Sequence, residues 1–368
     1  MNYQASVDKL KTTAMQANAA MYPGYFALVM ATGIVSTALL LTGYKTASGW
    51  LFALNTAAYP TLIVATALRA AFFPRALWRD LTNPGTVFLS FTFVAGTGVL
   101  GVQFALRSYT TIALGLWAVA ATTWLVLSYF SIGVLTFKNA QTPPESINAS
   151  WLIAIVGTQS VVVLGTILAP HVHGQKIALL VAMCGMWGIG VALYLVFITL
   201  VIYRLFFVRM DAAEMMPPYW IVLGATAISS LSGATLLQAA GKVAFLHDIA
   251  PMIEGLTLLL WAWSTWWIPM LVIFGIWRHG IRGAPLRYHP SFWSLVFPIG
   301  MYTVATFRLA VTAGIPLLAS IPRVMVWVAS AAWTVTMLGL LRSIANWIRV
   351  AVIAEDGNRQ RHRTPGAG

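Results

Sequence analysis

The stretch FWSLVFPIGMYT, Phe292–Thr303, lies inside an apolar run long enough to cross a bilayer, yet it carries Pro298 and Gly300 near its middle. A proline inside a helix lacks a backbone donor and clashes with the carbonyl four residues earlier, here that of Ser294. In lipid, the freed carbonyl needs a partner from the protein or from a water-filled cavity. The stretch therefore predicts a kinked membrane helix that borders a cavity.

The composition extends this prediction to the whole chain. Of 368 residues, 59% are hydrophobic and 8% are charged, with a mean hydropathy of +0.80, whereas soluble domains carry about 25% charged residues. The single cysteine, Cys184, excludes an intrachain disulfide. The net charge of +13 is spread over the ends of the apolar runs, with no continuous basic face, so we expect no nucleic-acid partner.

Windows of about 20 apolar residues mark membrane-spanning helices. They predict ten spans, roughly at 22–43, 50–73, 85–106, 110–136, 149–170, 177–208, 218–240, 251–277, 290–312 and 320–348. Residues 21–350 thus form one transmembrane domain, preceded by a segment at 1–20 and followed by a tail at 351–368 that we expect to be disordered. The predicted architecture is an all-α polytopic membrane protein.

The distribution of lysine and arginine orients the spans. With a cytoplasmic N-terminus, sixteen of the 22 basic residues lie on the inner side and five on the outer side, while Arg308 falls inside a span. Cytoplasmic loops carry the excess of positive charge in membrane proteins. We therefore expect a multi-pass protein of the bacterial inner membrane with both termini in the cytoplasm.

A similar phrase opens each odd-numbered span. The five copies are PGYFALVMATG at Pro23, PGTVFLSFTFVAG at Pro84, NASWLIAIVGT at Asn148, PPYWIVLGAT at Pro217 and HPSFWSLVFPIG at His289. The repeat predicts five helical hairpins in a pseudo-fivefold arrangement, with the odd helices inside. The alternative is that these aromatics and glycines merely mark membrane interfaces and helix packing.

Three phrases resemble one known family. They are VMATGIV at Val29–Val35, EGLTLLLWAWSTWWIPMLVI at Glu254–Ile273 and FWSLVFPIGMYTVAT at Phe292–Thr306. The chain resembles the tellurite-resistance/C4-dicarboxylate transporter family, which includes fungal malate permeases, sulfite exporters and plant slow anion channels. The resemblance covers about residues 20–350.

The resemblance implies a homotrimer in which the five odd helices of each protomer surround an anion pore. Its substrates would be small anions, either C4-dicarboxylates such as malate or oxyanions such as sulfite and tellurite. The residues that match the gate are Phe297 and Pro298, and the alternative for Phe297 is a ring that only fills the core. Glycines stand near mid-membrane in the five odd spans and are candidate kink or pore-lining positions: Gly33, Gly96, Gly157, Gly224 and Gly300.

Arg308 and Glu254 are charged residues at membrane depth. They can pair with each other, or Arg308 can line the pore, because it follows Phe297 by eleven residues and about 100° per residue returns it to nearly the same face. Polar residues also recur 18 to 20 positions after a starting proline or asparagine of each phrase (Pro23, Pro84, Asn148, Pro218 and Pro290): Thr42, Gln103, Thr166, Gln238 and Arg308. We expect an outer polar ring that attracts anions, although polar residues are common near span ends.

The absence of other chemical motifs narrows the function. No set of metal ligands, catalytic pair, haem-ligating histidine within a span or phosphate-binding loop stands out, so we expect neither an enzyme nor a cofactor. Coupled carriers bury titratable groups, and only Glu254 is available for that role. The sequence therefore predicts a passive anion transporter or channel in the bilayer, and the alternative is a proton-coupled anion carrier that uses Glu254.

Overall fold

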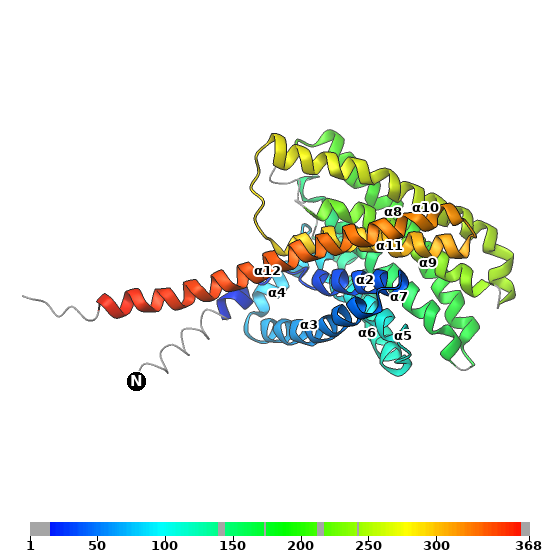
Figure 1. Ribbon diagram of the computed structural model, residues 1–368, viewed down its shortest axis with the longest axis horizontal. Coiled ribbons are helices and arrows are strands. Elements are labelled where there is room, and N and C mark those ends of the chain that lie inside the picture. The colour runs from blue at the N-terminus through cyan, green and yellow to red at the C-terminus, as the bar shows by residue number, and fades with distance from the viewer. Residues whose placement is uncertain (1–14, 139–143, 173, 212–216, 241–242, 362–368) are drawn as a thin grey trace, which may run out of the picture.

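The computed structural model describes residues 15–138, 144–172, 174–211, 217–240 and 243–361, and every regular element within them is a helix (Figure 1). The predicted all-α membrane architecture is confirmed. Most of the predicted N-terminal segment, and residues 362–368 of the predicted tail, lie outside the described residues. The first part of that tail differs from our expectation, because the last helix continues to Arg361.

Ten apolar helices account for the predicted spans. They are α2 (Ala27–Leu41), α3 (Lys45–Phe72), α5 (Phe91–Ala105), α6 (Thr110–Phe137), α7 (Ile153–Leu168), α8 (Lys176–Phe207), α9 (Ile221–Ala240), α10 (Ala244–Ile276), α11 (Trp293–Thr312) and α12 (Ser320–Arg361). Among the described residues, nine of these segments are long enough to cross a membrane when their adjoining turns are included, and α2 is shorter at 15 residues. The chain is a multi-pass membrane protein.

The repeated phrases form tight turns at the start of the odd helices. Four of them fold as 3-10 helices: η1 (Val87–Ser90), η3 (Ala149–Leu152), η5 (Pro217–Trp220) and η7 (Pro290–Phe292). Side chains cap two of these turns, because Asn148 Oδ1 accepts from the Ser150 amide at 2.9 Å and His289 Nδ1 accepts from the Ser291 amide at 3.2 Å. Burial lowers the pKa of His289, which keeps that nitrogen free to accept the bond.

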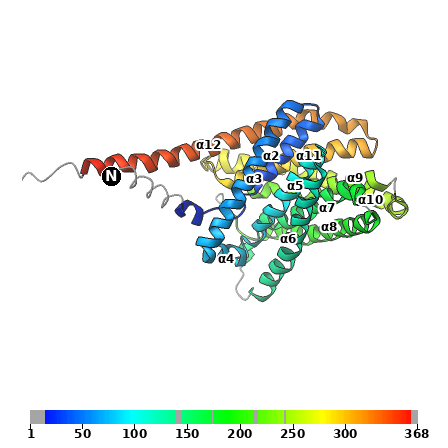
Figure 2. The ribbon, with the colours of Figure 1, turned by 90° about the horizontal axis from the view of Figure 1, so that it is seen from below.

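Burial separates the helices into two layers. In the four long segments that contain α5, α7, α9 and α11, between 72% and 94% of the most apolar window is buried, against 11% to 28% in the segments of α3, α6, α8, α10 and α12. Helix α2 belongs to the buried class, since 13 of its 15 residues are buried. The apolar faces of the second group are left for lipid, so the odd spans are the inner helices and the even spans the outer ones (Figures 1 and 2).

The inner helices close into a ring in chain order. Helix α2 packs on α5, α5 on α7, α7 on α9, α9 on α11, and α11 packs back on α2. Each outer helix packs on the inner helix that precedes it and touches the inner helix that follows it, and α12 closes the series by touching α2. This contact order fits the predicted five hairpins. Fivefold rotational symmetry itself stays a prediction.

Aromatic side chains on the outer helices tie the two layers together. The hydrogen-bonded pairs are Tyr59 with Thr97 at 2.8 Å, Trp124 with Thr158 at 2.7 Å, Trp187 with the Ser229 carbonyl at 3.0 Å, Trp261 with Thr306 at 2.9 Å and Trp333 with Thr32 at 3.0 Å. In every pair the outer helix reaches the inner helix that comes next around the ring. Such bonds give buried polar groups a partner where lipid offers none.

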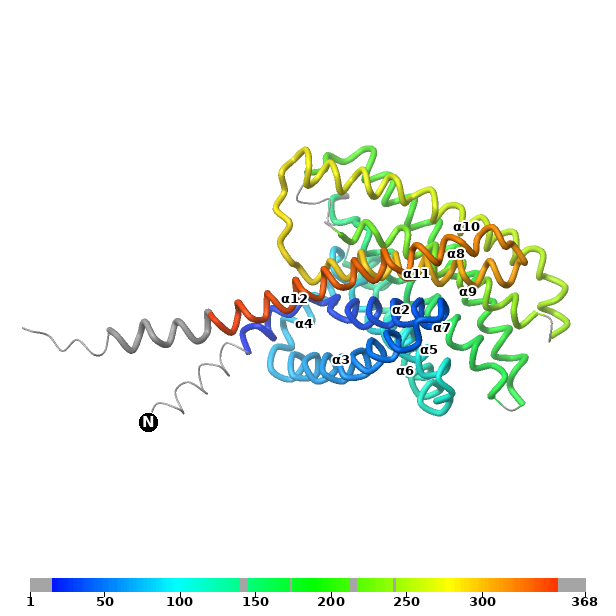
Figure 3. Tube along the Cα trace, viewed as in Figure 1, coloured from blue at the N-terminus to red at the C-terminus, as the bar shows by residue number. Residues whose placement is uncertain are grey.

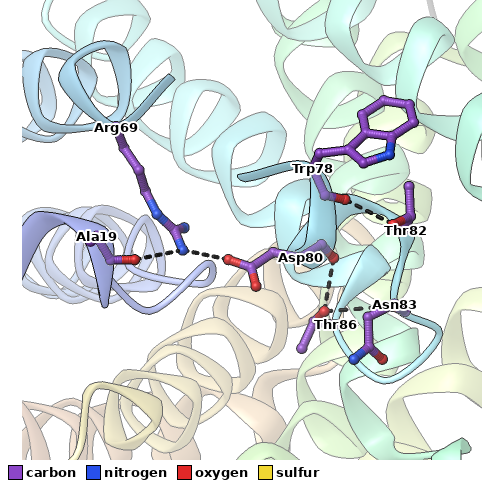
Figure 4. Close-up of polar contacts among 7 residues, drawn as sticks. All are labelled: Ala19, Arg69, Trp78, Asp80, Thr82, Asn83 and Thr86. Atoms are coloured by element: carbon purple, nitrogen blue, oxygen red, sulfur yellow. Dashed lines mark hydrogen bonds and ion pairs between the residues drawn. The ribbon is translucent and has the colours of Figure 1, made fainter. Parts of the chain in front are cut away.

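A short helix that the hydropathy pattern missed lies at the N-terminal end of the ring. Helix α4 (Pro74–Thr82) is too short and too polar for a span. It is held by Arg69 at the end of α3, whose Nη2 lies 2.6 Å from Asp80 Oδ2 and 3.3 Å from the Ala19 carbonyl oxygen (Figure 4). Thr86 donates to the Asp80 carbonyl oxygen at 2.8 Å. These contacts join α3, α4 and the segment before α2.

We expect Arg69→Met to lower the free energy of unfolding by about 3 kcal/mol, because it leaves the carboxylate of Asp80 without its buried cation. Only 5% of the Arg69 side chain and 16% of the Asp80 side chain are exposed. Thermal unfolding in detergent measures the effect. The double variant Arg69→Met/Asp80→Leu should recover most of the loss, and a double variant as unstable as the single one would contradict a dominant role for the unpaired charge.

Candidate pore within the inner ring

A narrow cavity of about 40 Å³ lies along the centre of the ring. All five inner helices contribute to its wall. The lining residues are Ile34, Thr37 and Leu41 of α2; Gly98, Val99 and Val102 of α5, followed by Leu106; Ser160, Val163 and Ile167 of α7; Ile228, Leu231, Thr235 and Gln238 of α9; and Met301, Val304 and Arg308 of α11. No aspartate or glutamate is among them.

The positions of these residues show how the helices are arranged. Each inner helix lines the cavity with its C-terminal half, so all five run in the same direction. Within a helix the lining residues recur every three or four positions, as with Met301, Val304 and Arg308, which is the spacing of one helical face. One stripe of each helix therefore forms the wall of a common pathway.

The wall is mostly apolar, and its hydroxyl groups are already engaged. Thr37 donates to the Gly33 carbonyl at 2.9 Å, Ser160 to the Val156 carbonyl at 2.8 Å, and Thr235 to the Leu231 carbonyl at 2.7 Å. Each bond runs back to the same helix, so these hydroxyls are not free donors for a bound ion. A wall of this kind binds an ion weakly, which suits passage rather than storage.

Arg308 is the charged residue in the wall of this cavity. Within the part of the chain that the structure describes, its guanidinium makes no hydrogen bond or ion pair. Glu254, which the sequence offered as a partner, lies exposed on α10, and no ion pair joins the two. Arg308 therefore faces the pathway, as the eleven-residue spacing from Phe297 suggested, with its charge available to an ion.

Arg107, which follows α5 near the C-terminal end of the inner helices, differs from Arg308 because its guanidinium is bound by the protein. Its guanidinium donates to Ser48 Oγ at 2.7 Å and to the Gln103 carbonyl at 3.1 Å, and it lies 4.2 Å from the centre of the Phe52 ring. Burial lowers the pKa of Arg107, but an arginine remains cationic at neutral pH. Its charge is bound to the protein, so the two arginines are not equivalent.

A second cavity adjoins the first at its C-terminal end. Its volume is about 250 Å³, and it shares Thr235, Gln238 and Arg308 with the central cavity. Thr166 and Lys176 are further members of its wall, and again no carboxylate is present among the lining residues. We call this second cavity the vestibule. It has two cationic side chains, and Arg308 stands where it meets the central cavity.

Phe297 lies at the other end of the central cavity. It precedes Met301 by four residues on the same face of α11, its side chain is 1% exposed, and it is not among the lining residues. The cavity therefore stops short of this ring. Pro298 is seated on α9, because a Cβ added at Gly224 would meet Pro298 Cγ at 2.9 Å. The two residues thus lie beyond the N-terminal limit of the cavity on α11, next to α9.

The five glycines expected as kinks or wall positions lie at seams between inner helices instead. None of them lines the central cavity. A Cβ added to each would meet a neighbour: Gly33 would meet Val99 at 2.6 Å, Gly96 the Phe26 carbonyl at 3.3 Å, Gly157 Phe91 at 3.0 Å, Gly224 Pro298 at 2.9 Å and Gly300 Ile34 at 2.8 Å. They allow close approach of the helices, which is the usual role of small residues in membrane bundles.

The expected outer polar ring is only partly assembled. Gln238 and Arg308 line both the central cavity and the vestibule, and Thr166 lines the vestibule alone. Thr42 instead donates to the Ala38 carbonyl of its own helix at 2.8 Å, and Gln103 accepts a bond from Asn55 of α3 at 2.8 Å. These last two residues face away from the pathway, so a ring of five members is not formed.

Four polar wall residues escaped the sequence analysis: Thr37, Ser160, Thr235 and Lys176. The spacing of one helical face could have identified two of them, because Thr235 precedes the lining residue Gln238 by three residues and Thr37 precedes the lining residue Leu41 by four.

Among the described residues, no three His, Cys, Asp or Glu side chains come together in a way that could hold a metal ion.

Comparison with known proteins gives a consistent result. The sequence pattern of a family described as voltage-dependent anion channel matches residues 20–341. An uncharacterized transporter of Methanocaldococcus jannaschii is 24% identical over 327 residues, covering 87% of this chain and 94% of the relative. A sulfite efflux pump of Trichophyton rubrum is 25% identical over 318 residues, covering 78% of this chain and 81% of the relative. An uncharacterized membrane protein of Mycobacterium tuberculosis is 39% identical over 153 residues, covering 42% of this chain and 77% of the relative.

Among the described residues, the chain is a multi-pass membrane protein whose inner helices surround a central cavity. It belongs to the voltage-dependent anion channel family, whose pattern covers nearly all of the membrane domain. The resemblance drawn from the three sequence phrases is thereby confirmed at the level of the family. The relatives named above are similar to this chain in sequence, and their substrates remain properties of those proteins.

Proposed function

We propose that this chain conducts small anions passively through the cavity of the inner ring. The observation that carries the proposal is the charge of the pathway: Arg308 and Lys176 line its open end, Arg308 has no protein partner among the described residues, and no carboxylate lines either cavity. An anion entering the vestibule gains from both charges. A cation entering it meets repulsion and finds no counter-charge.

The ring of Phe297 is the proposed gate. It is a bulky side chain at the closed end of the cavity, on a helix that contains a proline one position later. A displacement of this ring would join the cavity to the N-terminal side of the bundle. Pro298 supports this role because its contact with Gly224 fixes the backbone beside the ring, while the ring itself has side-chain rotamers to move between.

The substrate class follows from the size and chemistry of the wall. A narrow, apolar pathway with a free arginine suits small anions. A related protein is described as a sulfite efflux pump, and the family resemblance also includes malate permeases. We therefore infer that sulfite and C4-dicarboxylates are the first substrates to test, followed by nitrate and chloride.

A proton-coupled mechanism has less support. Glu254 would have to exchange protons in step with the anion, yet it is exposed on an outer helix and lines neither cavity.

The proposal also includes the homotrimer implied by the resemblance, which the mass of the purified complex tests. It further includes the cytoplasmic placement of both termini inferred from the basic residues, which labelling of introduced cysteines tests.

Flux of sulfite, malate, succinate, nitrate and chloride into proteoliposomes, with and without a proton gradient, tests the proposed function. We expect flux down the anion gradient that does not depend on the proton gradient. Empty liposomes and liposomes with a heat-treated protein are the controls. If flux requires the proton gradient and disappears in Glu254→Gln, the mechanism is proton-coupled and not passive. If no anion is transported, both the passive and the coupled mechanism are contradicted.

A further inference from the structure

A large cavity outside the pathway lies between α12 and the segment that leads into α11. Its volume is about 600 Å³, and its wall comes from residues 286–292 on one side and 335–346 on the other. Figure 3 shows this segment running from the end of α10 to the start of α11 beside α12. The cavity belongs to the end of the bundle at which the inner helices begin, so it is separate from the vestibule.

A glycine shapes this cavity. Tyr288 packs directly on α12 at Gly339, where an added Cβ would meet Tyr288 Cδ2 at 2.9 Å and Cβ at 3.2 Å. On its other side, Tyr288 accepts a hydrogen bond from Trp293 Nε1 at 3.2 Å. The segment is therefore fixed against α12 at one point, and the space beside that point stays open.

The side chains of the cavity change in character along α12. Val335 and Leu338 are apolar and exposed, and they are followed by Arg342 and then Asn346 on the same helical face. From Val335 to Arg342 the helix rises about 10 Å. Such an order, apolar and then cationic, matches the passage from the hydrocarbon of a bilayer to its headgroups.

Two arginines give the polar end of the cavity its charge. Arg342 comes from α12 and Arg287 from the facing segment, and both are exposed. Within the described part of the chain, neither guanidinium makes a hydrogen bond or ion pair, and no aspartate or glutamate lines the cavity. The protein thus leaves both charges unneutralised beside one cavity, where an anionic group could form charge-assisted hydrogen bonds with both.

We propose that this cavity binds one anionic phospholipid. Its phosphate would lie between Arg287 and Arg342, with Ser343 and Asn346 as further polar contacts, and its acyl chains would lie along Val335 and Leu338. Basic pockets between helices at the membrane surface bind anionic headgroups, and arginine forks suit phosphate oxygens. The exposed apolar residues Val335 and Leu338 beside the two arginines favour a lipid over free phosphate, because free phosphate has no acyl chains to contact them.

The test is lipid binding to the purified full chain in neutral detergent, measured by native mass spectrometry and by thermal unfolding. Phosphatidylglycerol should remain bound and raise the unfolding temperature, whereas phosphatidylcholine and inorganic phosphate should not. We expect affinity for phosphatidylglycerol to fall about fivefold for Arg287→Gln or Arg342→Gln alone and about 30-fold for both, since each basic residue near a membrane surface contributes about 1 kcal/mol.

Arg209→Gln is the matched control, because Arg209 is another exposed arginine that follows α8 at the same end of the bundle and does not line the cavity. Its affinity for phosphatidylglycerol should equal that of the natural chain. Arg342→Lys keeps the charge and should retain most of the binding, which separates charge loss from misfolding. Equal binding by the double variant, equal binding of phosphatidylcholine, or displacement of phosphatidylglycerol by inorganic phosphate would overturn the proposal.

Discussion

Replacing Phe297 by alanine should raise passive anion flux by about tenfold or more, which corresponds to a barrier lower by at least ~1.4 kcal/mol. The central cavity stops short of this ring, and Phe297 is the residue one turn beyond Met301 on the lining face of α11. Removing the ring opens the pathway at the point where it is closed. Flux into proteoliposomes, for the best substrate of the natural chain, measures the change.

The same substitution also removes a buried side chain, and a Phe→Ala change in a core costs about 3–5 kcal/mol of stability. Phe88→Ala provides the matched control. Phe88 is 2% exposed, but its ring packs against Trp151 and Phe197, toward the outer helix α8. We expect it to destabilise the fold to a similar extent without raising flux. A comparable flux increase in both variants would indicate general loosening and would contradict the proposed gate.

Reversing the charge of Arg308 should have the opposite effect and a larger one. At an effective dielectric constant of about 20, a unit charge about 6 Å from a passing anion contributes about 3 kcal/mol, and Arg308→Glu replaces this attraction by an equal repulsion, a change of about 6 kcal/mol. The variant should therefore lower anion flux by about 100-fold or more. The guanidinium lines both the central cavity and the vestibule without a protein partner among the described residues. The selectivity for anions over cations, from reversal potentials in planar bilayers, should fall as well.

Two variants separate this electrostatic effect from structural damage. Arg308→Lys keeps the charge and should keep most of the flux. Arg323→Glu makes the same charge change on an exposed arginine near the start of α12, outside both cavities, and should leave flux within about twofold, because exposed charges beyond a Debye length of about 8 Å are screened. Unchanged flux and selectivity in Arg308→Glu would remove Arg308 from the pathway.

The fold was largely predictable because a bilayer imposes strong local rules. A helix that crosses lipid needs about 20 apolar residues, so hydropathy alone located the spans. The repeated phrases also separated inner from outer helices, since a tight 3-10 start recurs at α5, α7, α9 and α11. Helix boundaries were less accurate. Helix α10 begins at Ala244, seven residues before the predicted start, because His247 and Asp248 lower the local hydropathy without breaking the helix.

The candidate site was predictable where helical phase could be measured along one helix. Arg308 follows Phe297 by eleven residues, which returns to one face; Arg308 lines the central cavity, whereas Phe297 is buried one turn before Met301, the first lining residue of α11. The polar ring was less accurate because it compared different helices. A window of 18 to 20 residues covers about 200° of rotation, enough to turn Thr42 and Gln103 away from the cavity. Sequence spacing within a phrase does not fix how each helix is rotated about its axis.

The glycines show a similar limit. Their depth in the membrane was visible in the sequence, but their neighbours were not, because contact with another helix is a property of the assembled ring. Gly224 accommodates Pro298 and Gly300 accommodates Ile34. Both seams involve α11, so the helix that carries Pro298 is fitted by glycines to both of its neighbours in the ring.

The order in which the ring closes has a consequence for synthesis of the protein. Helix α11 lies between α9 and α2, so the wall has a gap on one side until this ninth span has been inserted. Phe297 and Arg308 both belong to that span. A nascent chain that stalls earlier has an unsealed wall and no continuous conduit, while the chain that completes the wall receives its proposed gate in the same step.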